Sequence, residues 1–122
     1  MKIAVASNDG KIISSHFGRT RGFVIFEIEG NEIKKREYLP NTFTGHHGGI
    51  HNRGLHHFDT HSAIIEALKD VNIVISHGMG RRLYDDLKNA GIDVYVCNET
   101  NVDEAIKLFL DGKLTNVEDL LH

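Results

Sequence analysis

The chain has 122 residues, of which 40% are hydrophobic and 25% charged, and its formal net charge is -3. This size and composition predict one globular domain over residues 1–122, with a core large enough to fold without disulfides. The negative charge argues against nucleic-acid binding, which needs a basic surface. No signal peptide and no membrane-spanning apolar run is visible, so we expect a cytoplasmic protein that does not bind membranes.

The first part of the chain predicts three strands. Residues 2–7 are an apolar run that ends at Asn8-Asp9-Gly10, a turn signal. Residues 22–29 are rich in aromatic and β-branched residues, and Gly30-Asn31 separates them from the charged segment 32–39. Gly-Asn between two strands is typical of a hairpin, and dense charge is typical of an edge strand.

The second part alternates between helices and strands. Helical spacing of apolar residues predicts helices at about 60–70 and 83–90, and Asn101 with Glu104 forms a capping box for a third. The apolar runs 71–76 and 92–97 predict buried parallel strands. Residues 115–121 are compatible with one further helical turn.

The predicted order is β-β-β-α-β-α-β-α. An antiparallel start followed by parallel strands with right-handed crossovers is the order of ribonuclease H-like folds. We therefore predict an α/β protein with a ribonuclease H-like, mixed five-stranded sheet and helices packed on it. In this topology His16, the loop 41–59, His77 and Cys97 all lie at the carboxyl end of the parallel strands, where open α/β sheets hold ligands.

Histidines are concentrated in one glycine-containing stretch, residues 45–61. Imidazole nitrogen binds Zn, Fe, Cu and Ni, so this stretch is a candidate metal site. The alternative is a solvated loop that picks up metals adventitiously, because the spacing matches no closed zinc site. The candidate metal ligands are His46, His47, His51, His56, His57 and His61.

A second candidate site binds anions or a cofactor. His16, followed by Phe17-Gly18-Arg19, is interpreted as a metal ligand or as a hydrogen-bond donor to an anionic cluster, with Arg19 adding positive charge. The alternative is a structural turn in which Phe17 packs.

The segment His77-Gly78-Met79-Gly80-Arg81 joins a strand to a helix. The free amides of a helix N-terminus bind anions, so His77, Gly78, Gly80 and Arg81 are further candidates. Alternatively, the glycines merely permit a tight turn. Cys97 is interpreted as a core residue rather than a ligand.

With these residues in place, the chain resembles the dinitrogenase iron–molybdenum cofactor biosynthesis family, which includes NifX-like carriers and the C-terminal domain of NifB. The resemblance runs from residue 1 to about 113. It rests on the MKIAVAS start, Ser15-His16-Phe17-Gly18, the His/Gly-rich loop, Gly78-Met79-Gly80 before a helix that ends in Ala90-Gly91-Ile92, and a closing helix with Thr100, Val102, Glu104 and Ala105. It implies a ribonuclease H-like fold and non-covalent binding of an iron–molybdenum or related metal–sulfur cluster. It also implies a nitrogen-fixation-related accessory role beside cofactor-assembly proteins, without catalysis.

Three functions therefore compete. The first is a non-catalytic cluster carrier, whose exchangeable ligands include His16. The second is a buffer or sensor of simple Zn, Ni or Fe ions. The third is a His-ligated metallohydrolase. A nuclease is disfavoured, because the predicted strands 2–7 and 71–76 carry no carboxylate that could hold Mg²⁺. Neither the oligomeric state nor the cargo follows from the sequence.

Overall fold

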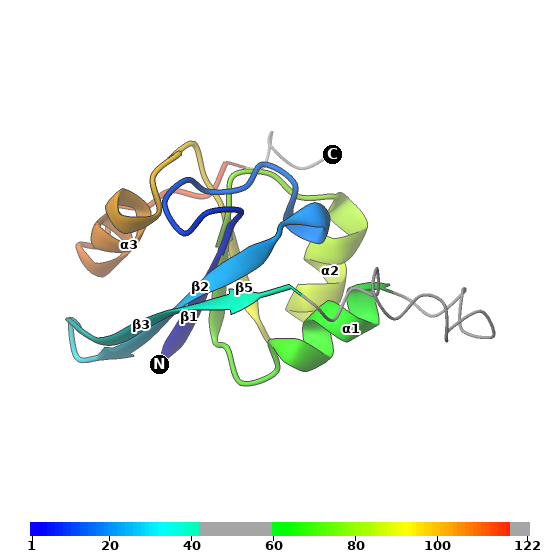
Figure 1. Ribbon diagram of the computed structural model, residues 1–122, viewed down its shortest axis with the longest axis horizontal. Coiled ribbons are helices and arrows are strands. Elements are labelled where there is room, and N and C mark those ends of the chain that lie inside the picture. Colours follow the sequence, from blue (N-terminus) through cyan, green and yellow to red (C-terminus); the bar gives the residue numbers. More distant parts are fainter. Residues whose placement is uncertain (42–59, 118–122) are drawn as a thin grey trace.

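The computed structural model describes residues 1–41 and 60–117, with the backbone alone for residues 60–63. Within them the chain forms a five-stranded sheet with helices on both faces (Figure 1). The strands are β1 (Lys2–Ser7), β2 (Gly22–Glu29), β3 (Glu32–Pro40), β4 (Ile73–Ser76) and β5 (Asp93–Val96). The helices are α1 (Thr60–Ala67), α2 (Arg81–Asn89), α3 (Val102–Leu110) and a short 3₁₀ helix, η1 (Phe17–Arg19).

The strand order is β3-β2-β1-β4-β5. β1 pairs antiparallel with β2, and β2 pairs antiparallel with β3, whereas β1, β4 and β5 run parallel. The mixed five-stranded sheet and its strand directions are as the sequence predicts. The carboxyl ends of β1, β4 and β5 therefore share one end of the sheet with the start of β2 and the end of β3.

The central strands β1 and β4 are buried on both faces of the sheet, which explains their continuous apolar runs. Because side chains alternate along a strand, Ala4 and Ala6 of β1 pack in the cluster that contains Leu87 of α2. Ile3 and Val5 pack in the opposite cluster, which contains Ile106 of α3. Helices α1 and α2 thus cover one face and α3 the other (Figure 1).

The two edges of the sheet are treated differently. Every residue of β3 is exposed, and ion pairs such as Lys35–Glu37 (3.7 Å) line this edge, as the charge pattern predicts. At the other edge, the Asn116 side chain accepts from the Val96 amide at 2.9 Å and donates to the Val94 carbonyl at 3.2 Å. The stretch 113–117 is not helical, because it lies along β5 and satisfies this edge instead.

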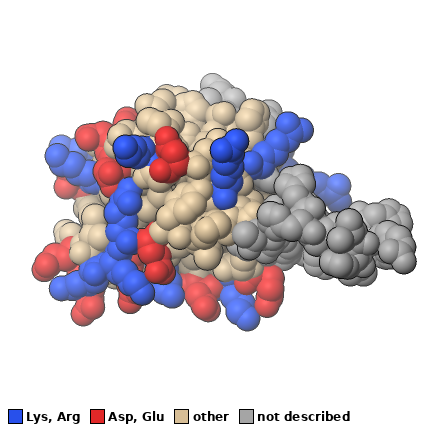
Figure 2. All heavy atoms as spheres, viewed as in Figure 1, with Lys and Arg blue, Asp and Glu red and all other residues tan. Residues whose placement is uncertain are grey.

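Helix α3 starts as predicted: the Asn101 side chain accepts a hydrogen bond from the Glu104 amide at 2.9 Å. Acidic and basic side chains are interspersed over the face shown in Figure 2. In the part of the chain that the structure describes, every helix is too short or too polar to cross a membrane.

Candidate functional site

Three connections meet at the carboxyl end of the parallel strands. The segment after β1 is hydrogen-bonded to the segment after β4, through His77 N to Ser14 O and Phe17 N to Gly78 O, both 3.4 Å. It is also bonded to the segment after β5, through Ile13 N to Thr100 O at 2.8 Å. The predicted convergence of these connections is therefore confirmed.

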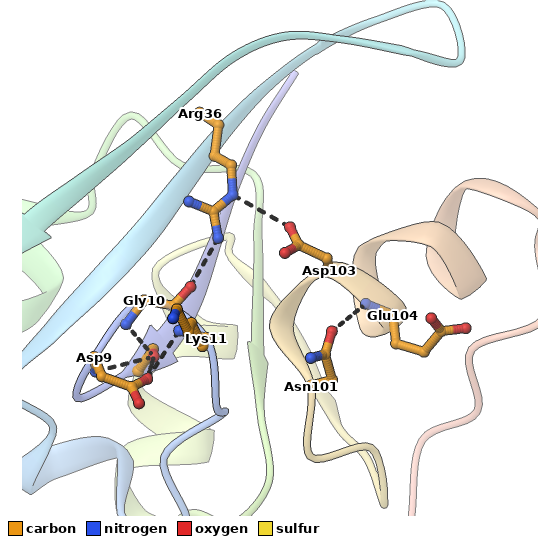
Figure 3. A network of polar contacts seen from close by, with 8 residues as sticks. Asp9, Gly10, Lys11, Arg36, Asn101, Asp103 and Glu104 are labelled. Carbon is orange, nitrogen blue, oxygen red and sulfur yellow. Dashed lines mark hydrogen bonds and ion pairs between the residues drawn. The ribbon is translucent and has the colours of Figure 1, made fainter.

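A compact turn forms the first part of the β1–β2 connection. The buried Ser7 hydroxyl donates to the Ile12 carbonyl at 2.6 Å and accepts from the Gly10 amide at 2.8 Å. The Asp9 carboxylate accepts from the amides of Lys11 and Ile12 at 2.8 and 2.9 Å (Figure 3). These amides lower the pKa of Asp9 below its ordinary value, because they stabilise the charged carboxylate. The Asp9 carboxylate therefore stays ionised and hydrogen-bonded to the backbone of its own turn.

The second part of the connection presents His16 and Arg19. Phe17 is fully buried, with its ring centroid 5.2 Å from that of Phe23, and so anchors η1 to the core. His16 precedes η1 and Arg19 ends it, and both residues are exposed. Phe17 therefore packs as the structural interpretation of this turn expects, and the turn holds the polar side chains of His16 and Arg19 at the surface.

These two parts enclose a surface recess of about 350 Å³, which we term the β1–β2 hollow. Its floor includes the buried residues Ile13 and Ser14, and its rim is mostly polar. The hollow is lined by Asn8, Asp9, Ile12, Ile13, Ser14, Ser15, His16 and Arg19. It therefore combines one imidazole, one guanidinium, two serines and one occupied carboxylate.

The backbone amides around the hollow are largely committed within the protein. The amides of residues 9–12 bond to the side chains of Ser7 and Asp9, and those of Ile13 and Ser14 bond to the carbonyls of Thr100 and Ala6. The His16 amide bonds to the Ser14 hydroxyl at 3.2 Å. An anion in the hollow would therefore meet side chains rather than a nest of amides like those of phosphate loops.

The β4–α2 connection lies beside the hollow and does not line it. Met79 is fully buried and fixes this connection to the core under α1 and α2. His77 is partly exposed, with Nδ1 3.1 Å from the Glu99 carbonyl. Gly80 is the N-cap of α2 and supplies no side-chain cap, and Arg81 is exposed. Of the six predicted cofactor-binding residues, the structure brings His16 and Arg19 into one recess.

Cys97 follows β5 and is only 1% exposed, in the cluster beneath α3. Burial raises the pKa of its thiol, although a hydrogen bond from the Glu99 backbone opposes the shift. The thiolate form that binds metals is therefore disfavoured. This agrees with the interpretation of Cys97 as a core residue.

The other predicted metal ligands are not tested. His46, His47, His51, His56 and His57 lie outside the described residues, and His61 lies in α1 without a described side chain. Within residues 1–41 and 64–117, no three His, Cys, Asp or Glu side chains gather closely enough to hold a metal ion. The described part of the site thus offers few ligands.

The chain can now be compared with known proteins. The family model described as dinitrogenase iron-molybdenum cofactor matches residues 1–112. The chain belongs to this family. A relative, an uncharacterized protein of Methanocaldococcus jannaschii, is 42% identical over 118 residues, which span 97% of the chain and 92% of the relative.

Two solved structures share the fold of this member of the dinitrogenase iron-molybdenum cofactor family. The crystal structure of the protein PH0822 is similar with a TM-score of 0.76 and 29% identity, over 98% of this chain and 97% of that one. The NMR structure of a candidate NifB protein from Thermotoga is similar with a TM-score of 0.66 and 27% identity, over 94% and 91% of the two chains. The family resemblance inferred from the sequence is confirmed.

Sequence reasoning missed part of the hollow in this family member. Asn8-Asp9-Gly10 is recognisable as a turn, yet its role as one wall of the recess depends on the fold. The sequence signal that could have found it is Asp9 itself, since an aspartate side chain often accepts a hydrogen bond from the backbone amide two residues later and so forms a local turn. Ser14 has no signal in the sequence, and Ser15 is marked only as part of the motif Ser15-His16-Phe17-Gly18.

Proposed function

We propose that this protein is a non-catalytic carrier that binds an iron–molybdenum or related metal–sulfur cluster at the β1–β2 hollow. It would act beside cofactor-assembly proteins in the cytoplasm, as one domain over residues 1–122, and would bind neither nucleic acid nor membrane. The observation that carries the proposal is the pairing of His16 and Arg19 at one recess in a member of this family. The strand order also supports a ribonuclease H-like designation of the fold.

The donor set of the hollow suits a cargo that is released. A metal–sulfur cluster is anionic and carries its own sulfide ligands, so a protein can hold it with one imidazole and hydrogen-bond donors. His16 would supply the imidazole, Arg19 positive charge, and Ser15 a hydroxyl. A permanently bound cluster usually takes several thiolates, whereas the one cysteine, Cys97, is buried.

The same geometry favours a carrier over a hydrolase. A general base works best with a pKa near the operating pH and a free lone pair facing the substrate. The carboxylate of Asp9 has a lowered pKa, and its Oδ1 accepts hydrogen bonds from two backbone amides. It is therefore suited to shaping the turn rather than to activating water.

The test begins with untagged protein purified without oxygen, whose metals are measured by mass spectrometry together with its visible spectrum. The metal-free protein is then titrated with tetrathiomolybdate, a small molybdenum–sulfur anion, and with a synthetic [4Fe–4S] cluster. We expect binding that His16→Ala and Arg19→Gln weaken and that Lys69→Gln, a charge-matched change at the opposite end of the sheet, leaves unchanged. His16→Gln separates the two roles of His16, since glutamine donates hydrogen bonds without ligating metals well.

Two outcomes would contradict the proposal. Tight stoichiometric zinc in a colourless protein would indicate an ion site or a hydrolase. Loss of all cluster binding on deletion of residues 45–57 would indicate a buffer that works through the His-rich segment alone. A carrier should retain part of its binding through His16 and Arg19.

A further inference from the structure

The wall of the hollow is held from outside by the edge strand β3. Tyr38 and Arg36 are two residues apart on β3, so their side chains leave the same face of the sheet. The strand β2 lies between β3 and β1, so a side chain of β3 must cross β2 to reach the segment that follows β1. Both Tyr38 and Arg36 make that crossing.

Tyr38 crosses β2 at a position without a side chain. Gly22 pairs with Ser7 on one side and with Pro40 on the other, and a Cβ at Gly22 would collide with the Tyr38 ring. The phenol hydroxyl lies 3.1 Å from the Ser7 carbonyl and 3.2 Å from the Asn8 carbonyl. Burial raises the pKa of Tyr38, so the hydroxyl keeps its proton and remains a donor. It therefore fixes the point where β1 becomes the wall of the hollow.

Arg36 crosses β2 above Phe26, whose ring centroid is 5.6 Å from the guanidinium carbon. Its Nη2 donates to the Gly10 carbonyl at 2.7 Å, and its Nε donates to the Asp103 carboxylate at 3.2 Å (Figure 3). Gly10 has a φ of +84°, at the sharpest point of the Asp9 turn. One planar guanidinium thus joins this turn to the first turn of α3.

We infer that Tyr38 and Arg36 are positioning residues that hold the Asn8–Asp9–Gly10 wall in the shape that binds cargo. Neither residue lines the hollow, so each acts through the backbone carbonyls of residues 7–10. The inference rests on the proposed function for its effect on binding. Its effect on the turn is independent of any cargo.

The hydrogen bonds of Asp9 differ in range from those of Tyr38 and Arg36, and this difference gives the two sets of contacts separate roles. Its carboxylate organises the turn from inside, through the amides of Lys11 and Ile12. These bonds are local and move with the turn as a unit. The contacts of Tyr38 and Arg36 are long-range, spanning 30 residues from Asn8 and 26 residues from Gly10. They therefore help to set where the turn sits relative to His16, together with the bonds from the Val102 amide to the Lys11 carbonyl (2.9 Å) and from the Arg21 amide to the Asn8 side chain (2.8 Å).

The test compares Tyr38→Phe and Arg36→Gln with two matched controls, Tyr84→Phe on α2 and Lys35→Gln on the same strand. Amide hydrogen exchange is measured by NMR at residues 10–14 and, as an internal reference, in β4. We expect each test variant to speed exchange at residues 10–14 by about 3- to 10-fold, the range that one net hydrogen bond supplies, with β4 unchanged. Arg36→Lys should recover only part of the loss, because one ammonium does not span both acceptors.

Tetrathiomolybdate affinity is measured on the same proteins, and we expect both test variants to weaken it by about 3- to 10-fold while the controls match the unmodified protein. Unchanged exchange at residues 10–14, or an equal rise in β4, would overturn the positioning role. If His16→Ala also binds tetrathiomolybdate normally, the proposed cargo site is wrong, and the exchange result alone decides the role of Tyr38 and Arg36. If His16→Ala weakens binding but Tyr38→Phe and Arg36→Gln do not, the proposed function stands and the positioning inference fails.

Discussion

Replacing Gly22 with alanine should destabilise the protein strongly, because the Tyr38 side chain occupies the space above this residue. A Cβ at Gly22 would overlap the end of the Tyr38 ring and lie 2.8 Å from the Leu39 carbonyl oxygen. Overpacking of this kind costs about 1–3 kcal/mol. Displacing the ring also weakens the hydrogen bonds to Ser7 and Asn8, which adds about 1 kcal/mol.

The expected loss in the free energy of unfolding is therefore roughly 2–4 kcal/mol, which moves the urea midpoint by roughly 1–2 M. The assay is urea unfolding followed by circular dichroism, repeated in a Tyr38→Ala background. There Gly22→Ala should cost at least about 1 kcal/mol less, because the ring overlap and the loss of the Tyr38 hydrogen bonds no longer contribute and only the contact with Leu39 remains. A wild-type midpoint for Gly22→Ala, or the same cost in both backgrounds, would refute the steric argument.

Three other predictions concern single side chains. Asp9→Ala should lower the free energy of unfolding at pH 7, because the backbone amides stabilise the charged carboxylate of Asp9. The difference in stability between variant and unmodified protein should shrink as the pH falls below 3.8, the ordinary pKa of aspartate, and through the lower pKa of the folded state. Urea unfolding at pH 7 and pH 3 checks this. Asn101→Ala should cost about 1 kcal/mol through loss of the α3 cap, whereas Asn101→Asp should be close to neutral in thermal unfolding. Cys97 should react with a thiol reagent at least about 100-fold more slowly in the folded protein than in urea; equal rates would contradict its burial.

Most of the fold could be predicted because its signals are local and periodic. The strands β1 and β4 are buried on both faces and β2 along most of its length, and the helices have clear apolar spacing and, at Asn101, a cap. The path of residues 113–117 could not be predicted, because it depends on the Asn116 side chain and on the bond from the Val117 amide to the Val96 carbonyl (2.6 Å). A single side-chain amide that bonds to the backbone of an edge strand, in place of a neighbouring strand, leaves no repeating pattern in the sequence.

The candidate site was predicted in outline and not in detail. Strand direction alone places His16 and His77 at the same end of the sheet. The contacts of Tyr38 and Arg36 depend on the register between β2 and β3, which shifts between Glu27 and Ile28. A shift of one residue sends a side chain to the other face, so the sequence of β3 in isolation does not predict which of its side chains contact residues 7–10 beside the hollow.

Around the hollow, the hydrogen-bonded backbone amides maintain the fold, whereas exposed side chains provide the groups that would contact a ligand. Because the N–H groups of residues 9–14 donate hydrogen bonds within the protein, the backbone of this segment would contribute little to the selection of a ligand. In the proposed carrier, discrimination among cargoes would depend on a few exposed side chains, chiefly Ser15, His16 and Arg19. A carrier built in this way would change its inorganic cargo over evolutionary time through point substitutions at these positions, without any change of fold.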